Sequence, residues 1–359
     1  MARIGVFLPN WVGDVVMATP ALGGLWQRFS DRATLVGIMR PYVAEVLAGS
    51  RWFHEQVVGE RRGLAGLCAL AARLRRLRLD TVLLFTNSFS TALLARLSGA
   101  GRRVGFSRDG RGWLLTDRLN APRVGRDYLP RSAVAHYLDV VGVLGCDTGF
   151  RPLELATTVE DEAEADALWA RFGWRAGDKV AVLNTGAAHG AAKTWPDEHF
   201  TALARWLATT RQLRVLLICG PAERRAVAEI CRQADHPFVK SLADQESRIG
   251  LSKACVRRGS LMVTTDSGPR HFAAAFDVPC ITLFGPTDPE WSDNYNRRAI
   301  DLSLDLPCAP CAKRTCPLGH HRCMRELTVE MVAAAVTQLM ERSGTSTDLP
   351  GRWHAAERR

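Results

Sequence analysis

The chain has 359 residues, 47% hydrophobic and 23% charged, which is an ordinary globular composition and predicts about two domains. No apolar run approaches the roughly 18 residues of a membrane-spanning helix. The few residues before Pro9 are too short for a secretory signal, so we expect a cytoplasmic protein. The net charge of +10 is concentrated in residues 1–150, where 20 Arg and no Lys accompany 11 acidic residues, against 27 basic and 26 acidic residues in 151–359. This excess predicts an acidic partner for the first half, such as nucleic acid, anionic lipid or a phosphorylated sugar.

The first half alternates short β-type runs with helical stretches, a pattern typical of parallel sheets covered by helices. The expected strands are Ile4–Leu8, Thr34–Ile38, Thr81–Phe85 and Val104–Phe106. The expected helices are Asp14–Phe29, Tyr42–Ala48, Leu64–Leu77, Ser90–Leu97 and Ser132–Leu144. The polar stretch from Gly145 to Thr158 has no clear period, so we expect a linker there and an N-terminal domain over residues 1–150.

The same alternation restarts with an expected helix at Asp161–Phe172. The expected strands that follow are Val180–Asn184, Val215–Cys219, Leu261–Thr264 and Cys280–Phe284. The expected helices are Glu198–Thr209, Glu223–Gln233, Pro269–Phe276 and Glu330–Arg342. The second domain therefore covers residues 159–342, and 343–359 is expected to be a disordered tail. The predicted fold class is α/β, with two Rossmann-like, doubly wound domains whose ligands bind beyond the carboxyl ends of the strands.

Asp14 lies just after the first expected strand, in the loop that begins at Pro9 and contains Gly13. Aspartate is a favoured N-cap of a helix, and that role alone would account for the residue. The alternative is a general base at the end of a strand, able to remove a proton from an attacking hydroxyl group. On the motif alone, the capping role is preferred.

Two loops of the second half could contact a phosphorylated nucleoside. The loop Thr185–Pro196 is rich in small residues and contains Lys193, a combination that suits a phosphate. A flexible loop with a solvated lysine would explain the same sequence equally well. Glu223 follows the strand Val215–Cys219 and could bind a ribose. An acidic residue in the first turn of a helix is the preferred interpretation of Glu223.

The segment around Asp266 carries the strongest functional signal of the chain. An apolar strand ends in Asp266-Ser267-Gly268, and Pro269 stands where a helix would begin. Backbone amides at that helix start, together with His271, predict an anion site suited to a pyrophosphate, and Asp266 could bind a sugar hydroxyl. A capped helix with a buried histidine would leave Asp266 and His271 unexplained.

Four of the ten cysteines are clustered, namely Cys308, Cys311, Cys316 and Cys323. Four thiols within so short a segment could close a tetrahedral zinc site with a structural role. The spacing is compact for a zinc ribbon, so a redox-sensitive cluster and simple packing remain alternatives.

The stretch Leu64–Leu79, preceded by Arg61 and Arg62, is amphipathic and basic. Its arginines are Arg73, Arg75, Arg76 and Arg78. Such a helix could lie on an anionic membrane. A core helix with a solvated basic face is the commoner arrangement and is slightly preferred.

Several segments in chain order resemble the ADP-heptose:lipopolysaccharide heptosyltransferases of glycosyltransferase family 9, most closely the heptosyltransferase II branch. The matching segments are Trp11–Asp14, Gly186 with Ala192–Pro196, Asp266–Gly268 with His271, Leu283–Thr287 and Cys308–Met324. As a set they are specific, and they extend over nearly the whole chain.

This resemblance implies a GT-B fold, with two Rossmann-like domains facing a cleft, and an inverting, metal-independent transfer of heptose from an ADP-sugar to the lipopolysaccharide inner core. It makes Asp14 the general base, in place of the capping role. By analogy Lys193 neutralises the donor phosphates, Ser267, Gly268 and His271 hold the pyrophosphate, Glu223 lies near the ribose and Asp266 near the heptose. It further implies no required cofactor, a phosphorylated Kdo-bearing lipid A acceptor, and a cytoplasmic protein peripheral to the inner membrane.

Two other functions remain as alternatives. A nucleotide-sugar 2-epimerase could use the same scaffold and would need no acceptor. A nucleic-acid-binding protein would fit the sequence pI of about 9.4 and the cysteines, but the aromatic and basic interleaving of the usual modules is missing. We therefore expect no nucleic-acid partner.

Overall fold

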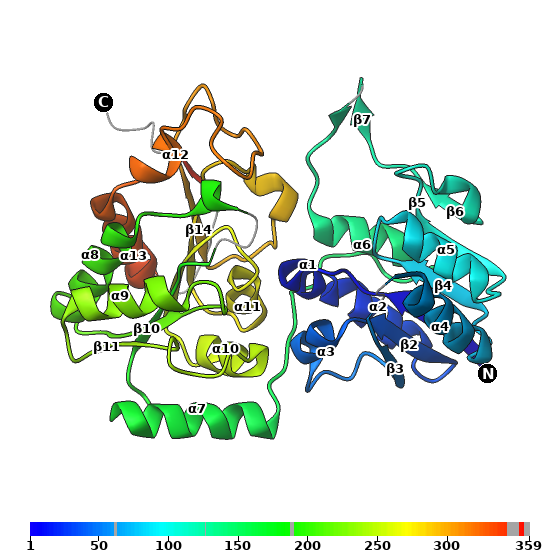
Figure 1. The fold of residues 1–359 in the computed structure, drawn as a ribbon, viewed down its shortest axis with the longest axis horizontal. Coiled ribbons are helices and arrows are strands. Elements are labelled where there is room, and N and C mark those ends of the chain that lie inside the picture. The colour runs from blue at the N-terminus through cyan, green and yellow to red at the C-terminus, as the bar shows by residue number, and fades with distance from the viewer. Residues whose placement is uncertain (61–62, 126, 187–189, 343–351, 355–359) are drawn as a thin grey trace. The chain divides into compact units, whose positions relative to one another are not determined.

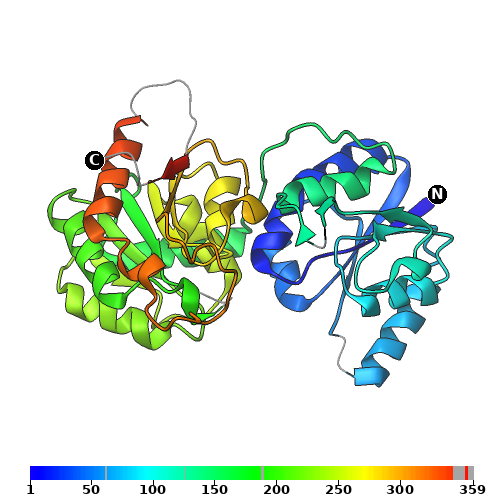
Figure 2. The same cartoon turned by 90° about the horizontal axis from the view of Figure 1, so that it is seen from above.

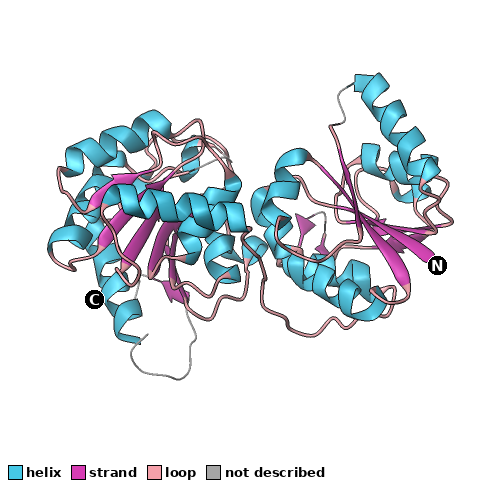
Figure 3. Cartoon of the chain, turned by 90° about the horizontal axis from the view of Figure 1, so that it is seen from below, coloured by secondary structure: helices cyan, strands magenta, loops and turns pink. Residues whose placement is uncertain are grey.

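The computed structural model describes residues 1–60, 63–125, 127–186, 190–342 and 352–354. The chain forms two compact units, one of Met1–Ala156 with Glu290–Asn294 and one of Thr157–Pro289 with Tyr295–Arg359. Each unit contains a parallel sheet with helices on both faces (Figures 1 and 3). The expected α/β class with two doubly wound domains is confirmed.

The sheet of the first unit has the strand order β3-β2-β1-β4-β5-β6, and all neighbouring strands are parallel. Its strands are β1 (Ala2–Phe7), β2 (Ala33–Met39), β3 (Glu55–Val58), β4 (Thr81–Leu84), β5 (Arg102–Phe106) and β6 (Asp117–Leu119). The chain runs outward from β1 to β3 and then returns to the other side of β1. The topological switch point, where such sheets bind ligands, therefore lies between β1 and β4.

The helices of the first unit lie along this sheet. They are α1 (Val12–Met17), α2 (Thr19–Phe29), α3 (Pro41–Leu47), α4 (Gly63–Arg76), α5 (Phe89–Leu97) and α6 (Ala133–Gly142). A 3-10 helix, η1 (Gly112–Leu114), precedes β6, and β7 (Arg123–Val124) pairs antiparallel with β8 (Asp127–Tyr128).

The single helix expected over Asp14–Phe29 is two helices in the structure, α1 and α2. The interruption has a local cause, because Pro20 has no backbone N–H to continue the helical hydrogen bonds. The Thr19 hydroxyl donates instead to the Val16 carbonyl at 2.7 Å. The break leaves α1 as a short helix directly after β1, which places its first turn at the carboxyl edge of the sheet.

The sheet of the second unit has the order β11-β10-β9-β12-β13-β14-β15, again parallel throughout. Its strands are β9 (Val180–Asn184), β10 (Arg214–Ile218), β11 (Val239–Ser241), β12 (Leu261–Thr265), β13 (Cys280–Leu283), β14 (Ala299–Ser303) and β15 (Arg352–His354). Here the switch point lies between β9 and β12. The central strands β9, β12 and β13 are buried along their whole length, as expected for strands covered on both faces.

The helices of the second unit frame this sheet. They are α7 (Val159–Phe172), α8 (Asp197–Thr209), α9 (Arg224–Ala234), α10 (Ile249–Arg257), α11 (Arg270–Ala275), α12 (Arg322–Arg325) and α13 (Val329–Arg342). Two 3-10 helices, η2 (Ala191–Lys193) and η3 (Pro289–Ser292), complete the elements. Pro289 of η3 belongs to the second unit, and its residues from Glu290 on belong to the first unit. None of the described helices is both long and apolar enough to cross a bilayer.

The sequence analysis did not predict the short antiparallel pair β7 and β8, and in the two parallel sheets it did not predict β3, β6, β11, β14 and β15. They lie in the outer parts of the sheets, where they are short or carry polar residues, so their apolar signal is weak. The tail 343–359 was expected to be disordered, whereas its three described residues, Arg352–His354, pair with β14. An unpaired strand edge offers N–H and C=O groups that a further segment can use.

Candidate active site

Asp14 lies in the first turn of α1, at the switch point of the first sheet. It does not cap the helix, because the N-cap residue is Trp11 and no side chain makes a capping hydrogen bond. The capping interpretation of Asp14 is therefore wrong. The Asp14 carboxylate has no hydrogen bond or ion pair with any of the described residues.

The surroundings of Asp14 favour a carboxylate that can accept a proton. Burial raises the pKa of Asp14 from 3.8 to about 6. Burial, and the nearby charge of Asp14, raise the pKa of the Tyr137 hydroxyl well above its usual value. A carboxyl group with a pKa near 6 is ionised at neutral pH and is a stronger base than an ordinary aspartate, which is what general base catalysis requires.

A buried guanidinium group lies at the same edge of the first sheet. Arg111 has no exposed surface, and its donors reach the carbonyl oxygens of Phe106 (3.0 Å), Thr86 (2.6 Å) and Ser88 (3.3 Å) and the side-chain oxygen of Asn87 (3.1 Å). Burial lowers the pKa of Arg111 to about 10, so the group stays protonated at neutral pH. It ties together the loops that follow β4 and β5.

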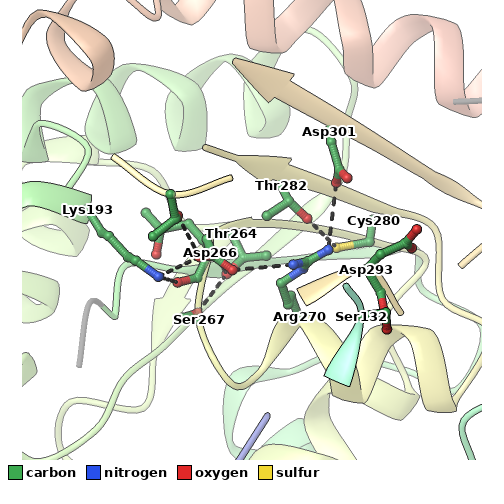
Figure 4. Close-up of polar contacts among 12 residues, drawn as sticks. Ser132, Lys193, Thr264, Asp266, Ser267, Arg270, Cys280, Thr282, Asp293 and Asp301 are labelled. Carbon is green, nitrogen blue, oxygen red and sulfur yellow. Dashed lines mark hydrogen bonds and ion pairs between the residues drawn. The ribbon is translucent and has the colours of Figure 1, made fainter. Parts of the chain in front are cut away.

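The second unit brings Lys193 and Asp266 into direct contact at its own switch point. The Lys193 amino group lies 2.5 Å from one carboxylate oxygen of Asp266 and 3.3 Å from the Asp266 carbonyl oxygen (Figure 4). Each residue is only 8% exposed. Lys193 is therefore a buried, paired cation and not the solvated lysine that its loop alone would allow.

Two residues that the sequence analysis did not single out complete the surroundings of Asp266. The Arg270 guanidinium lies 3.3 Å from the other carboxylate oxygen, and the Thr287 hydroxyl donates at 2.8 Å to the oxygen that Lys193 contacts. Burial alone would raise the pKa of Asp266, but the charges of Arg270 and Lys193 and the hydrogen bonds from Lys193 and Thr287 hold it well below its usual range. Asp266 is therefore a permanent anion.

Ser267 and Gly268 form the turn between β12 and α11. The Asn184 side-chain amide donates to the Ser267 hydroxyl at 2.7 Å and to the Thr264 hydroxyl at 2.9 Å, which fixes the position of the Ser267 oxygen. The backbone amides of Ser267 and Gly268 have no acceptor among the described residues. Two backbone amides therefore remain available to an anion at this turn, whereas the Ser267 hydroxyl also lies 3.2 Å from the Thr264 hydroxyl.

His271 lies in the first turn of α11, is 3% exposed and packs inside the unit. Burial, and the positive charges of Arg270 and Lys193, lower its pKa well below the usual value, so the imidazole is neutral. It can donate one N–H to a partner but brings no positive charge to the turn.

The loop that carries Lys193 is fastened at both ends. The Thr265 hydroxyl donates to the Gly186 carbonyl at 2.6 Å, and the Ala192 amide donates to the Arg314 carbonyl at 3.0 Å. Gly190 has a φ of 149°, and a Cβ there would lie 2.5 Å from the Arg314 carbonyl oxygen, so only glycine fits this close approach. The centre of the loop, residues 187–189, lies outside the described residues.

Glu223 stands directly before α9, at the end of the loop that follows β10. Glu223 is half-buried. One of its carboxylate oxygens lies so close to Gly220 that a Cβ on that glycine would be only 2.8 Å from it. Because β10 is next to β9, Glu223 belongs to the same edge of the sheet as Lys193 and Asp266. It does not touch either residue.

The cysteine segment packs against the loops of this edge but does not form a metal site in the structure. The Ala312 amide donates to the Pro286 carbonyl at 2.6 Å, and a Cβ on Gly285 would meet the Cys323 sulfur at 3.2 Å. Burial and the nearby thiols of Cys311, Cys308 and Cys316 raise the pKa of Cys323. In the described part of the chain, no three His, Cys, Asp or Glu side chains are arranged to hold a metal ion.

Comparison with known proteins identifies the fold and the family. The structure is similar to the crystal structure of a glycosyl transferase family 9 protein from Veillonella parvula DSM 2008, with a TM-score of 0.81, 23% identity, and coverage of 95% of this chain and 97% of that one. It is also similar to E. coli ADP-heptose lps heptosyltransferase II, with a TM-score of 0.77, 22% identity, and coverage of 96% and 100%. In sequence it is 26% identical to lipooligosaccharide heptosyltransferase 2 of Campylobacter jejuni subsp. jejuni serotype O:2, over 95% of this chain and 99% of the relative.

The two doubly wound units, each with polar side chains at its switch point, are the architecture of a GT-B glycosyltransferase. Residues 67–322 match glycosyltransferase family 9 (heptosyltransferase), and the chain belongs to this family. It is therefore a glycosyltransferase, and the resemblance that the motifs indicated is confirmed.

Proposed function

We propose that the protein transfers heptose from ADP-L-glycero-D-manno-heptose to the inner core of lipopolysaccharide, with inversion and without a metal ion or other cofactor. The observation that carries the proposal is the turn at Ser267 and Gly268, whose free amides lie next to the buried Lys193. The similarity to heptosyltransferases over almost the whole chain supports the choice of donor and acceptor.

In the proposed reaction the acceptor hydroxyl attacks the anomeric carbon of the donor while Asp14 takes its proton. The bond between the anomeric carbon and the phosphate oxygen breaks, and ADP leaves with the bonding electrons. Two of the three Lys193 N–H groups are used by Asp266, so the third can reach the leaving phosphate. The Ser267 and Gly268 amides supply further donors, which together take the role that a metal ion has in other transferases.

The remaining donor-binding assignments follow from position on the same sheet edge. We assign Asp266 to the heptose hydroxyls, because a permanent carboxylate accepts their hydrogen bonds. Glu223, one strand away, is assigned to the ribose of the adenosine. His271 is assigned to the pyrophosphate side of the turn, where it acts as a neutral donor.

The acceptor is proposed to be the phosphorylated, Kdo-bearing core on lipid A. The arginine excess of residues 1–150 complements such an anionic molecule. Because lipid A is anchored in a bilayer, we propose that the protein works in the cytoplasm, peripheral to the inner membrane. Nucleic acid is not part of the proposal.

The assay that tests this function uses the purified full chain, ADP-heptose and a defined inner-core acceptor, without added divalent cation. We expect ADP release and a product heavier by one heptose, identified by mass spectrometry. The matched reactions omit the acceptor or replace ADP-heptose with other nucleotide sugars. Release of nucleotide or of an isomerised sugar without acceptor would contradict transfer and would support an epimerase.

We also propose that the cysteine segment holds a structural zinc ion when the protein is made in cells. The support is the spacing of the four cysteines in the sequence; in the described residues no three such side chains converge, so the segment would have to close around the ion. Metal analysis of protein purified without added metal should find about one zinc per chain, and Cys308→Ser with Cys311→Ser should lose it. Metal-free wild-type protein with full activity would disprove this.

A further inference from the structure

Helix α4 has an unusual composition for a helix on a protein surface. Its first ten residues, Gly63–Ala72, contain no charged side chain, and their most polar group is the thiol of Cys68. A surface helix normally directs one apolar stripe inward and charged residues outward. The outward residues here are Leu64, Ala65, Cys68, Ala69 and Ala72, and Leu64 is 82% exposed.

The inward side of α4 is also apolar, so this part of the helix is apolar all around. Leu67, Leu70 and Ala71 pack against the core of the first unit, and Leu74 is the single fully buried residue of the helix. The sequence analysis slightly preferred a core helix with a solvated basic face. The packed face and the exposed arginines agree with that interpretation, but it does not account for the exposed alanine and leucine side chains in the first part of the helix.

Basic residues gather at the other end of α4, with Arg78 two residues beyond it. Arg73, Arg75, Arg76 and Arg78 are exposed, and none of them forms an ion pair with another described residue. Arg73 donates to the Val58 carbonyl at 3.1 Å, and the other three make no side-chain hydrogen bond with the described residues. The helix thus has an apolar first part and a cationic end that has no acidic partner in the described part of the chain.

The apolar end of α4 lies at the same edge of the sheet as Asp14. Because β1 and β3 are parallel to β2, the helices that follow them, α1 and α4, both begin at the carboxyl edge. Figures 2 and 3 show the first turns of α4 extending beyond the rest of the unit. The exposed aromatic pair Phe89 and Trp113, with ring centroids 6.2 Å apart, follows β4 and β5 at this edge.

We propose that α4 is a membrane-docking helix whose apolar first part enters the surface of an anionic bilayer while its arginines contact the lipid phosphates. Ten helical residues span about 15 Å, so an obliquely inserted helix keeps the arginines at the level of the headgroups. Exposed aromatic residues such as Phe89 and Trp113 favour the same interfacial region. The charge of the helix end complements anionic lipid, and a nucleic acid would leave the apolar part in water.

The test is flotation of the full chain with vesicles, and it does not depend on transferase activity. One set of vesicles contains phosphatidylcholine only, and the other contains equal parts of phosphatidylcholine and phosphatidylglycerol. Wild-type protein should float with the anionic set, and Leu64→Glu should weaken this binding by roughly tenfold or more. Arg75→Glu with Arg76→Glu should weaken it by a similar factor and remove the preference for the anionic lipid.

Matched controls separate these effects from general changes in charge. Val159→Glu alters an equally exposed residue, 83%, in the first turn of α7, and Arg171→Glu with Arg225→Glu makes the same charge change in the second unit. Both controls should bind like wild type. Unchanged binding of Leu64→Glu, or a vesicle-independent dimer that Leu64→Glu abolishes in sedimentation equilibrium, would overturn the proposal. Loss of vesicle binding by Leu64→Glu, with both controls bound like wild type, supports it.

Discussion

Asp14→Asn should lower the rate of heptose transfer by about 10²–10⁴-fold, the range by which a well-placed general base contributes. The amide keeps the size of the side chain but cannot take the proton of the acceptor hydroxyl. In wild-type protein the rate should rise with pH through about pH 6, where the Asp14 carboxyl ionises, and then level off. The residual activity of Asp14→Asn should not show this rise near pH 6. Steady-state assays from pH 5 to pH 8 measure both effects.

The same variant should be more stable than wild type near pH 8, which separates loss of catalysis from loss of folding. The folded-state pKa of Asp14 is about 6 against an ordinary value of 3.8, so the folded protein binds this proton more tightly than the unfolded chain does. The contribution of Asp14 to the free energy of unfolding is therefore greatest below about pH 4 and falls as the pH rises through 6, by about 3 kcal/mol for a shift of this size. Urea unfolding at pH 5 and pH 8 should show the gain of Asp14→Asn growing with pH. Asp31→Asn, at an exposed position of the same unit, is the control. An Asp14→Asn protein that transfers heptose at the wild-type rate would disprove the base assignment.

Lys193→Met should reduce both stability and transfer, because it leaves Asp266 as a buried carboxylate without its closest cation. Removing one partner of a buried ion pair typically costs about 3–5 kcal/mol. Removing a donor to the leaving group typically lowers kcat by about 10²–10³-fold. Thermal unfolding and the rate of ADP release in the presence of acceptor measure the two effects. Lys179→Met, which removes an exposed lysine of the same unit, should change neither.

Asp266→Asn distinguishes a structural role of the Lys193–Asp266 ion pair from a catalytic role. The folded-state pKa of Asp266 lies below its unfolded value, so its ionisation stabilises the protein at neutral pH, and this stabilisation is lost as the pH falls below about 4. The free energy of unfolding of Asp266→Asn should therefore change less than that of wild type as the pH falls below about 4. The double variant Lys193→Met with Asp266→Asn should recover stability without recovering transfer. A Lys193→Met protein with wild-type stability and kcat/KM would contradict both roles of Lys193.

The sequence predicted the central part of the fold well because its signals are local. Strands such as Val180–Asn184 are continuous apolar runs, and the parallel topology then places every following loop at one edge. That is why Asp266, Ser267 and Lys193 could be expected at one site before any coordinates were known. The outer strands β6 and β11 are short and half-buried, so their pattern did not differ from that of loops.

Pairwise contacts could not be predicted in the same way. Arg270 lies four residues after Asp266, a spacing that puts both on one side of a helical turn, but nothing local shows that the arginine points into the unit. The Thr287 contact joins the loops after β12 and β13, and it depends on how the two strands pair. For Asp14 the local rule of helix capping favoured the wrong role. Its place at the switch point became visible only with the order of the strands.

The wholly buried Arg111 has a consequence for how the first unit attracts anions. Its guanidinium group donates to neutral oxygen atoms, and the nearby Asp109 carboxylate acts on it without an ion pair among the described residues. Dissolved ions cannot surround a group that has no exposed surface, so within the unit its field is damped far less than that of the surface arginines, while beyond the protein surface salt damps both. At high salt concentration this cation should therefore still favour a phosphate group bound directly against the ends of β4 and β5, although it no longer attracts such molecules from a distance.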